Sequence, residues 1–172
     1  MQPENTILVD SFIKKYNYTR GAELGVRRGD FTEYLCKSNP NLHMIAVDLW
    51  GTHNVINENH EHEHNFRVSM EKFQPYKNRI TVIRKLTSEA AQDITNNSLD
   101  FVFIDATHTE QALLQDIKDW LPKINKDGII SGHDYHVHWD NGNMKKCIDR
   151  VFPKKIVDEW TCWYSFVKDI NL

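Results

Sequence analysis

Acidic side chains follow or end four short apolar runs of this sequence: Glu23, Asp48, Asp105 and Asp134. Any one such carboxylate is commonly a helix cap or a turn residue. Four on successive runs are a more specific signal, because carboxylates gathered in one place can bind sugar hydroxyls, hold a cation or handle a proton. We therefore expect the chemistry of this chain to lie where these runs end.

The two later acids are accompanied by histidines, His108 three residues after Asp105 and His133 directly before Asp134. Asp105 and Asp134 could share a hard cation such as Mg²⁺, which prefers oxygen ligands, with His133 as a further ligand. His108 could accept a proton from a substrate hydroxyl, because an imidazole titrates near neutral pH. A polar helix start at His108 and a turn at His133 are the alternatives.

The first acid belongs to a glycine turn, in which Gly25 and Gly29 follow Glu23. The dinucleotide fingerprint has a glycine where Glu23 stands, and an anion beside a pyrophosphate is repulsive, so a nicotinamide cofactor is disfavoured. A nucleoside with a positive charge and no phosphate suits the turn better, and S-adenosylmethionine is such a ligand. A plain glycine turn is equally consistent with these residues.

The second acid strengthens this interpretation. Asp48 comes 25 residues after Glu23, and a carboxylate at that place can accept hydrogen bonds from both ribose hydroxyls. Trp50 could then cover an adenine face, or else be a half-buried surface aromatic.

The elements that position these residues alternate between short apolar runs and helical periods. This alternation predicts an α/β fold of the doubly wound, Rossmann-like type, with a mostly parallel sheet covered on both faces. Strands are expected at 21–25, 43–47, 80–83, 99–104 and 129–132, with a closing antiparallel hairpin from 155–160 and 162–167. Helices are expected at 6–16, 30–35, 61–73, 88–94, 107–124 and 144–151. Asp30 and Thr107 each have a glutamate three residues later, as in a capping box.

Composition limits the class of protein. The chain has 172 residues, 40% hydrophobic residues and a net charge of −3, which suits a single globular domain over 1–172 and argues against nucleic acid as a partner. We find no membrane-spanning run, no secretory signal and an odd number of cysteines, so a reduced cytoplasmic protein is expected. Trp160, Trp163 and Tyr164, on an expected edge hairpin, could form a homodimer contact.

The chain resembles the class I S-adenosylmethionine-dependent methyltransferases over residues 20–167, most closely the small single-domain type related to metal-dependent sugar O-methyltransferases. The resemblance rests on four motifs: A-E-L-G-V-x-x-G at 22–29, V-D-L-W at 47–50, D-F-V-F-I-D-x-x-H at 100–108 and D-G-I-I-S-G-H-D-Y at 127–135. It implies a seven-stranded sheet with one reversed strand.

The resemblance also implies roles for single residues. Cofactor contacts are implied for Glu23, Gly25, Gly29, Asp48, Thr87, Ser88 and Asp105, with Mg²⁺ on Asp105 and Asp134 and with His108 as the base. His133 departs from the pattern, since the sugar-methylating relatives have an acid there, and Ala106-Thr107 replaces a G-D pair of other relatives. Fewer acids should weaken Mg²⁺ binding or favour a metal that accepts imidazole.

The expected function is O-methylation of a small hydroxylated acceptor, a sugar or a natural-product intermediate. The reaction could be assisted by Mg²⁺. The alternative is a cofactor-binding Rossmann-like protein without methyltransferase activity. A nicotinamide oxidoreductase and a nucleic-acid methyltransferase are less consistent with the residues. Two histidine groups stay open: His60 and His64 could chelate zinc or begin a solvated helix, and the loop at 135–143 could contact substrate or be a mobile surface loop.

Overall fold

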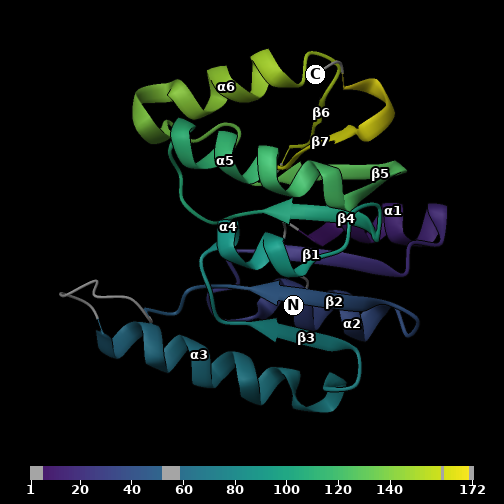
Figure 1. Ribbon diagram of the computed structural model, residues 1–172, viewed down its shortest axis with the longest axis vertical. Helices are drawn as coiled ribbons and strands as arrows, with labels where there is room; N and C mark the ends of the chain where they lie inside the picture. The colour runs from purple at the N-terminus through teal and green to yellow at the C-terminus, as the bar shows by residue number, and fades with distance from the viewer. Residues whose placement is uncertain (1–5, 52–58, 160, 171–172) are drawn as a thin grey trace.

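One seven-stranded sheet forms the centre of the computed structural model, which describes residues 6–51, 59–159 and 161–170 (Figure 1). The strands are β1 Arg20–Leu24, β2 His43–Val47, β3 Ile80–Ile83, β4 Leu99–Ile104, β5 Ile124–Gly132, β6 Ile156–Val157 and β7 Trp163–Phe166, in the order β3-β2-β1-β4-β5-β7-β6. The first five run parallel, and β7 is antiparallel to both of its neighbours. The predicted doubly wound sheet with a reversed closing strand is therefore confirmed.

Six α-helices among the described residues cover the two faces of the sheet. They are α1 Ile7–Tyr16, α2 Asp30–Ser38, α3 Asn59–Phe73, α4 Thr87–Ala90, α5 Glu110–Trp120 and α6 Asn143–Val151. Side chains alternate along a strand, so β4 sends Phe101 and Phe103 into the cluster with α1, α2 and α3, and Val102 and Ile104 into the cluster with α4, α5 and α6. A strand buried on both faces must be apolar, which explains the uninterrupted apolar run at 101–104. Asp100, near the start of β4, is half-buried and accepts hydrogen bonds from the Thr19 and Arg20 amides.

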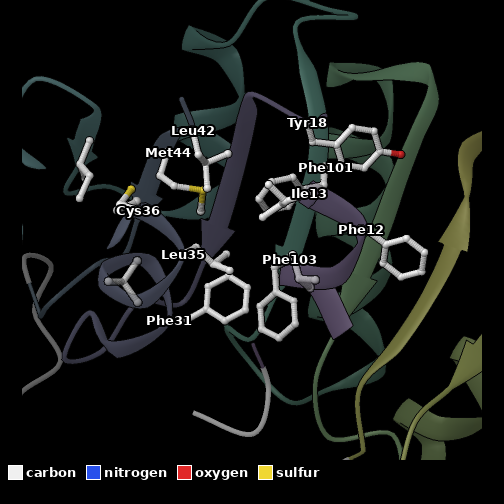
Figure 2. Packing of buried hydrophobic residues seen from close by; sticks show 14 of the residues in the cluster. Phe12, Ile13, Tyr18, Phe31, Leu35, Cys36, Leu42, Met44, Phe101 and Phe103 are labelled. Atoms are coloured by element: carbon white, nitrogen blue, oxygen red, sulfur yellow. The ribbon is translucent and has the colours of Figure 1, made fainter. Parts of the chain in front are cut away.

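Aromatic packing joins the first helices to the sheet. Phe31 of α2 stacks on Phe103 with ring centroids 4.2 Å apart (Figure 2). Phe12 of α1 meets Tyr164 of β7 edge-on, with ring centroids 4.4 Å apart. Trp163 and Tyr164 are buried in these two cores, and β7 lies inside the sheet, with β6 as its edge. The expectation that these two residues form a dimer contact is therefore wrong, and Trp160 lies outside the described residues.

Helix starts differ from the two predicted capping boxes. Gly29 occupies the N-cap position of α2 with a φ of +77°, and Asp30 is already helical. The Asp30 carboxylate pairs instead with Lys72 at 2.5 Å. Helix α5 is capped by Thr109, whose hydroxyl accepts a hydrogen bond from the Ala112 amide, so Thr107 precedes the helix.

Two further elements are shorter than expected. The helix predicted at 88–94 is a single α-turn, α4, followed by a 3₁₀ turn at Ala91–Asp93. The first hairpin segment has only the two residues of β6 in the sheet. Within the described residues, no helix is long and apolar enough to cross a membrane.

Candidate functional site

A cavity of about 750 Å³ opens where β1, β2, β4 and β5 end. Parallel strands place their carboxyl ends at one edge, and doubly wound folds bind ligands there. Eight of the predicted site residues line it: Gly25, Asp48, Trp50, Thr87, Asp105, His108, His133 and Asp134.

Two carboxylates and two imidazoles meet at one end of this cavity. The Nε2 atom of His108 lies 2.9 Å from Asp134 Oδ2 and 3.4 Å from Asp105 Oδ1. The Nδ1 atom of His133 lies 2.8 Å from Asp134 Oδ1 and 4.0 Å from Asp105 Oδ1. Asp134 thus sits between the two rings, with one oxygen toward each.

The electrostatics of the cluster follow from these contacts. Hydrogen bonds to Asp105 and Asp134 raise the pKa of His108 to about 9, against the opposing effect of burial. The hydrogen bond to Asp134 likewise raises the pKa of His133. Burial opposes ionisation of Asp134, but hydrogen bonds from His108, His133 and Trp139 outweigh it and hold its pKa below the ordinary value. The two carboxylates therefore favour the protonated form of His108.

The backbone fixes both aspartates at the strand ends. The Asp105 amide donates to the Leu24 carbonyl oxygen at 2.8 Å, which ties the end of β4 to β1. Asp134 follows β5 with a φ of +63°, a left-handed conformation that turns the chain sharply. The next amide, of Tyr135, donates to the Thr161 carbonyl oxygen at 2.9 Å and holds this turn against the loop before β7.

Asp105, His108 and Asp134 have the chemistry of a cation site. Their ligand atoms lie within 4.8 Å of one another and are all half-buried, and His133 is close enough to join them. Carboxylates fit Mg²⁺, whereas imidazoles suit Mn²⁺, Zn²⁺ and other transition metals. The residues present therefore fit a divalent cation.

Asp48 organises the glycine turn at the other end of the cavity. Its Oδ2 atom accepts hydrogen bonds from the Val26 and Arg27 amides, and its Oδ1 atom accepts one from the Trp50 amide, all at 2.8 Å. A carboxylate has about four acceptor positions, so one is left for a ligand hydroxyl. Gly25 follows β1 with a φ of +89° and rests against the main chain of Asp105.

Trp50 is more buried than a half-exposed surface aromatic would be. Only 2% of it is exposed, and its indole Nε1 donates to the Arg27 carbonyl oxygen at 2.8 Å. The ring packs against Phe66 of α3 at 5.1 Å. It borders the cavity from this fixed position.

Three predicted cofactor residues lie away from the cavity wall. Glu23 is buried and accepts a hydrogen bond from the Thr32 hydroxyl at 2.5 Å; burial raises its pKa well above the ordinary value. Gly29 begins α2 beside the Phe73 ring. Ser88 borders a separate hollow of about 260 Å³.

Two side chains at this site were not singled out by the sequence analysis, although Trp139 belongs to the loop at 135–143 that was expected to contact substrate or to be a mobile surface loop. Asp116 of α5 accepts a hydrogen bond from the Thr87 hydroxyl at 2.5 Å, beneath the cavity wall. Trp139 lines the cavity beside His108. An aspartate among the apolar positions of a helix was a usable signal for Asp116, and so was a tryptophan in an otherwise polar loop for Trp139.

A family model of a methyltransferase domain matches residues 22–135, about two thirds of the chain. The chain belongs to this methyltransferase family. The matched range includes all four motifs, and the resemblance to class I S-adenosylmethionine-dependent methyltransferases is confirmed.

Other similarities of this methyltransferase chain are more distant. It is 28% identical over 98 residues to the uncharacterized protein y4gI of Sinorhizobium fredii; the match covers 54% of the chain and 10% of that protein, so the chain spans about a tenth of its relative. A Staphylococcus aureus protein proposed to be a caffeoyl-CoA O-methyltransferase superposes with a TM-score of 0.69 at 13% identity, covering 95% of this chain and 82% of the other. The SAH-bound methyltransferase PaMTH1 of Podospora anserina superposes with a TM-score of 0.67 at 12% identity, covering 91% of this chain and 75% of the other. At such identities these structures show the shared fold alone; the family match supports S-adenosylmethionine as the cofactor.

Proposed function

We propose that this methyltransferase transfers the methyl group to a hydroxyl of a small acceptor, a sugar or a natural-product intermediate, with His108 as the base. The observation that carries the proposal is the position of His108 Nε2, 2.9 Å from Asp134 and 3.4 Å from Asp105 inside the cavity. Asp105, Asp134 and His133 would hold a divalent cation such as Mg²⁺. Such a cation supplies positive charge that lowers the pKa of an acceptor hydroxyl.

The transfer needs alignment and the removal of one proton. The acceptor oxygen forms a bond to the methyl carbon while the methyl–sulfur bond breaks, and the electron pair stays on sulfur in the neutral thioether that leaves. Holding the two reactants in line is the larger contribution of the protein. The acceptor proton goes to His108, a step worth about 10²- to 10⁴-fold in rate. An imidazolium accepts no proton, so this role requires that the charge of the two carboxylates be offset.

The other end of the cavity suits the cofactor. Gly25 leaves the turn open, and Asp48 keeps an acceptor position for a ribose hydroxyl. Thr87 and Trp50 border the space where an adenine would lie. Contacts of Asp105, Glu23, Gly29 and Ser88 with the cofactor remain predictions. Asp105 lines the cavity, whereas the other three residues lie outside its lining.

Calorimetric titration with S-adenosylmethionine and S-adenosylhomocysteine tests the cofactor, and transfer of a labelled methyl group to a panel of hydroxylated acceptors tests the reaction. We expect His108→Ala to lower turnover about 10²- to 10⁴-fold with little change in the cofactor Kd. His43→Ala is the matched control, because His43 is exposed at the opposite, amino end of β2. Absence of cofactor binding, or equal turnover of the two variants, would contradict the proposal.

A further inference from the structure

Trp139 differs from the other tryptophans that the structure describes. It is 44% exposed, whereas Trp50, Trp120 and Trp163 are each exposed by 2% or less. It also lines the cavity, next to His108 and Asp134. Ligand sites are lined largely by apolar and aromatic side chains, so an exposed indole at the wall of this cavity is a candidate contact for the acceptor.

Two contacts hold the indole in one orientation. Its Nε1–H donates to Asp134 Oδ2 at 2.8 Å. Its ring stacks on the His108 imidazole, with centroids 5.0 Å apart and planes inclined by 25°. One ring face is thus covered and the polar edge is already hydrogen-bonded, so the exposed surface available to a ligand is apolar.

The loop that carries Trp139 is built in an unusual conformation. Asp140, Asn141 and Gly142 follow with φ values of +51°, +54° and +81°. Such backbone persists only where surrounding contacts fix it, and here the Asp140 carboxylate accepts a hydrogen bond from the Glu110 amide at the start of α5, at 3.1 Å. The fold therefore anchors the loop to α5 and presents the indole at the cavity mouth.

We propose that Trp139 determines acceptor specificity by stacking the ring of a hydroxylated ring compound on its open face. An aromatic ring or the CH face of a pyranose fits an apolar indole surface, whereas an acyclic polyol offers no flat face. The acceptor then lies on the side of the indole opposite His108, so the hydroxyl that reacts must extend past the indole edge toward His108 and Asp134. This inference rests on the proposed function and adds the substrate class to it.

The indole N–H resonance of Trp139 in the full-length protein reports the stacking directly. Its disappearance in Trp139→Phe assigns the signal. We titrate catechol, methyl α-glucopyranoside and glycerol, each with and without S-adenosylhomocysteine. At least one ring compound should shift the signal and glycerol should not, and the responding ring shows whether the acceptor is aromatic or a sugar. No response to either ring, or an equal response to glycerol, would overturn the inference.

Variants separate stacking from the hydrogen bond to Asp134. Trp139→Leu should weaken binding of the responding ring by about tenfold or more, and Trp139→Phe should recover part of the loss, because phenylalanine keeps a ring but has no N–H. Val137→Ala, an exposed position of the same loop, is the matched control and should bind like the wild type. Equal ring affinity in Trp139→Leu with normal S-adenosylhomocysteine binding would overturn this inference alone. Failure of the wild type to bind S-adenosylhomocysteine would instead contradict the proposed function.

Discussion

Gly25 and Asp105 touch through their main chains: a β-carbon at position 25 would lie 2.2 Å from the Asp105 carbonyl oxygen. The turn after β1 and the end of β4 are therefore packed backbone to backbone. Because Gly25 belongs to the expected cofactor side and Asp105 to the acid cluster, this contact sets the distance between the two halves of the cavity.

Gly25→Ala should both destabilise the protein and weaken S-adenosylmethionine binding. The new methyl group meets the backbone of Asp105, and the φ of +89° is unfavourable for alanine. Gly142→Ala is the control. It has a similar φ of +81°, but its β-carbon would meet only His138 Nδ1, at 3.8 Å, so it separates the backbone strain from the contact with Asp105. Thermal unfolding should show a loss of about 1–2 kcal/mol for Gly142→Ala and a larger one for Gly25→Ala. Equal losses would mean that the close contact with Asp105 is not rigid.

Asp48→Ala should raise the Kd for S-adenosylmethionine at least tenfold in calorimetry, about 1.4 kcal/mol. The variant removes the acceptor of three backbone amides as well as the group expected on the ribose, so the turn loses its shape. The matched control is Asp30→Ala, which removes a surface carboxylate paired with Lys72. An unchanged Kd in Asp48→Ala would exclude Asp48 from cofactor binding.

Asp116→Asn should raise the free energy of unfolding above that of the wild type, and this gain should be larger at neutral pH than at pH 4. Burial raises the pKa of Asp116 from 3.8 to about 6, so the native state binds this proton more tightly than the unfolded state. Between these values the wild type therefore loses stability as pH rises, by about 2–3 kcal/mol, and above pH 6 the loss is complete. The asparagine oxygen can still accept the Thr87 hydroxyl bond without a charge.

Denaturant unfolding across pH 4–8 measures this difference. Asp93→Asn, at an exposed carboxylate paired with Lys85, serves as the control. A constant difference between wild type and Asp116→Asn across this range would contradict the assigned shift.

His133→Asp should increase Mg²⁺ affinity, by about tenfold or more, because it replaces an imidazole with an oxygen ligand beside Asp134. In the wild type, Mn²⁺ should bind more tightly than Mg²⁺ for the same reason. Calorimetric titration of both metals checks the order. His136→Asp adds the same charge at an exposed position of the same loop and should leave the affinity nearly unchanged; a similar gain there would indicate general electrostatic attraction.

The sheet could be predicted from the sequence because its signal is local. The run at 99–104, apolar except for Asp100, coincides with β4, and 43–47 and 80–83 coincide with β2 and β3. Helix starts were less predictable, because several polar residues compete for each cap. Thr107 and Thr109 both stand before α5, and only the backbone geometry, with Thr109 extended, decides which one caps it.

The meeting of Asp105, His108 and Asp134 also followed from the sequence, since parallel strands end at one edge and neighbouring strands bring their loops together. The directions in which individual side chains point could not be predicted from the sequence. Ser88 borders a separate hollow while Thr87 lines the cavity, because successive residues of a helix point about 100° apart, and Glu23 points into the core beside Thr32. The position of Trp139 depends on three consecutive left-handed residues. Asp140, Asn141 and Gly142 are residue types that favour this conformation, but the pattern does not say where the preceding indole points.

The sheet ends in strands of four and two residues, β3 and β6. Unpaired backbone groups at a sheet edge are the template on which chains add to one another and aggregate, and short edge strands offer few of them. Concentrated samples of the folded protein should therefore resist fibrillar association through the sheet, which favours the millimolar titrations that weakly bound small acceptors require.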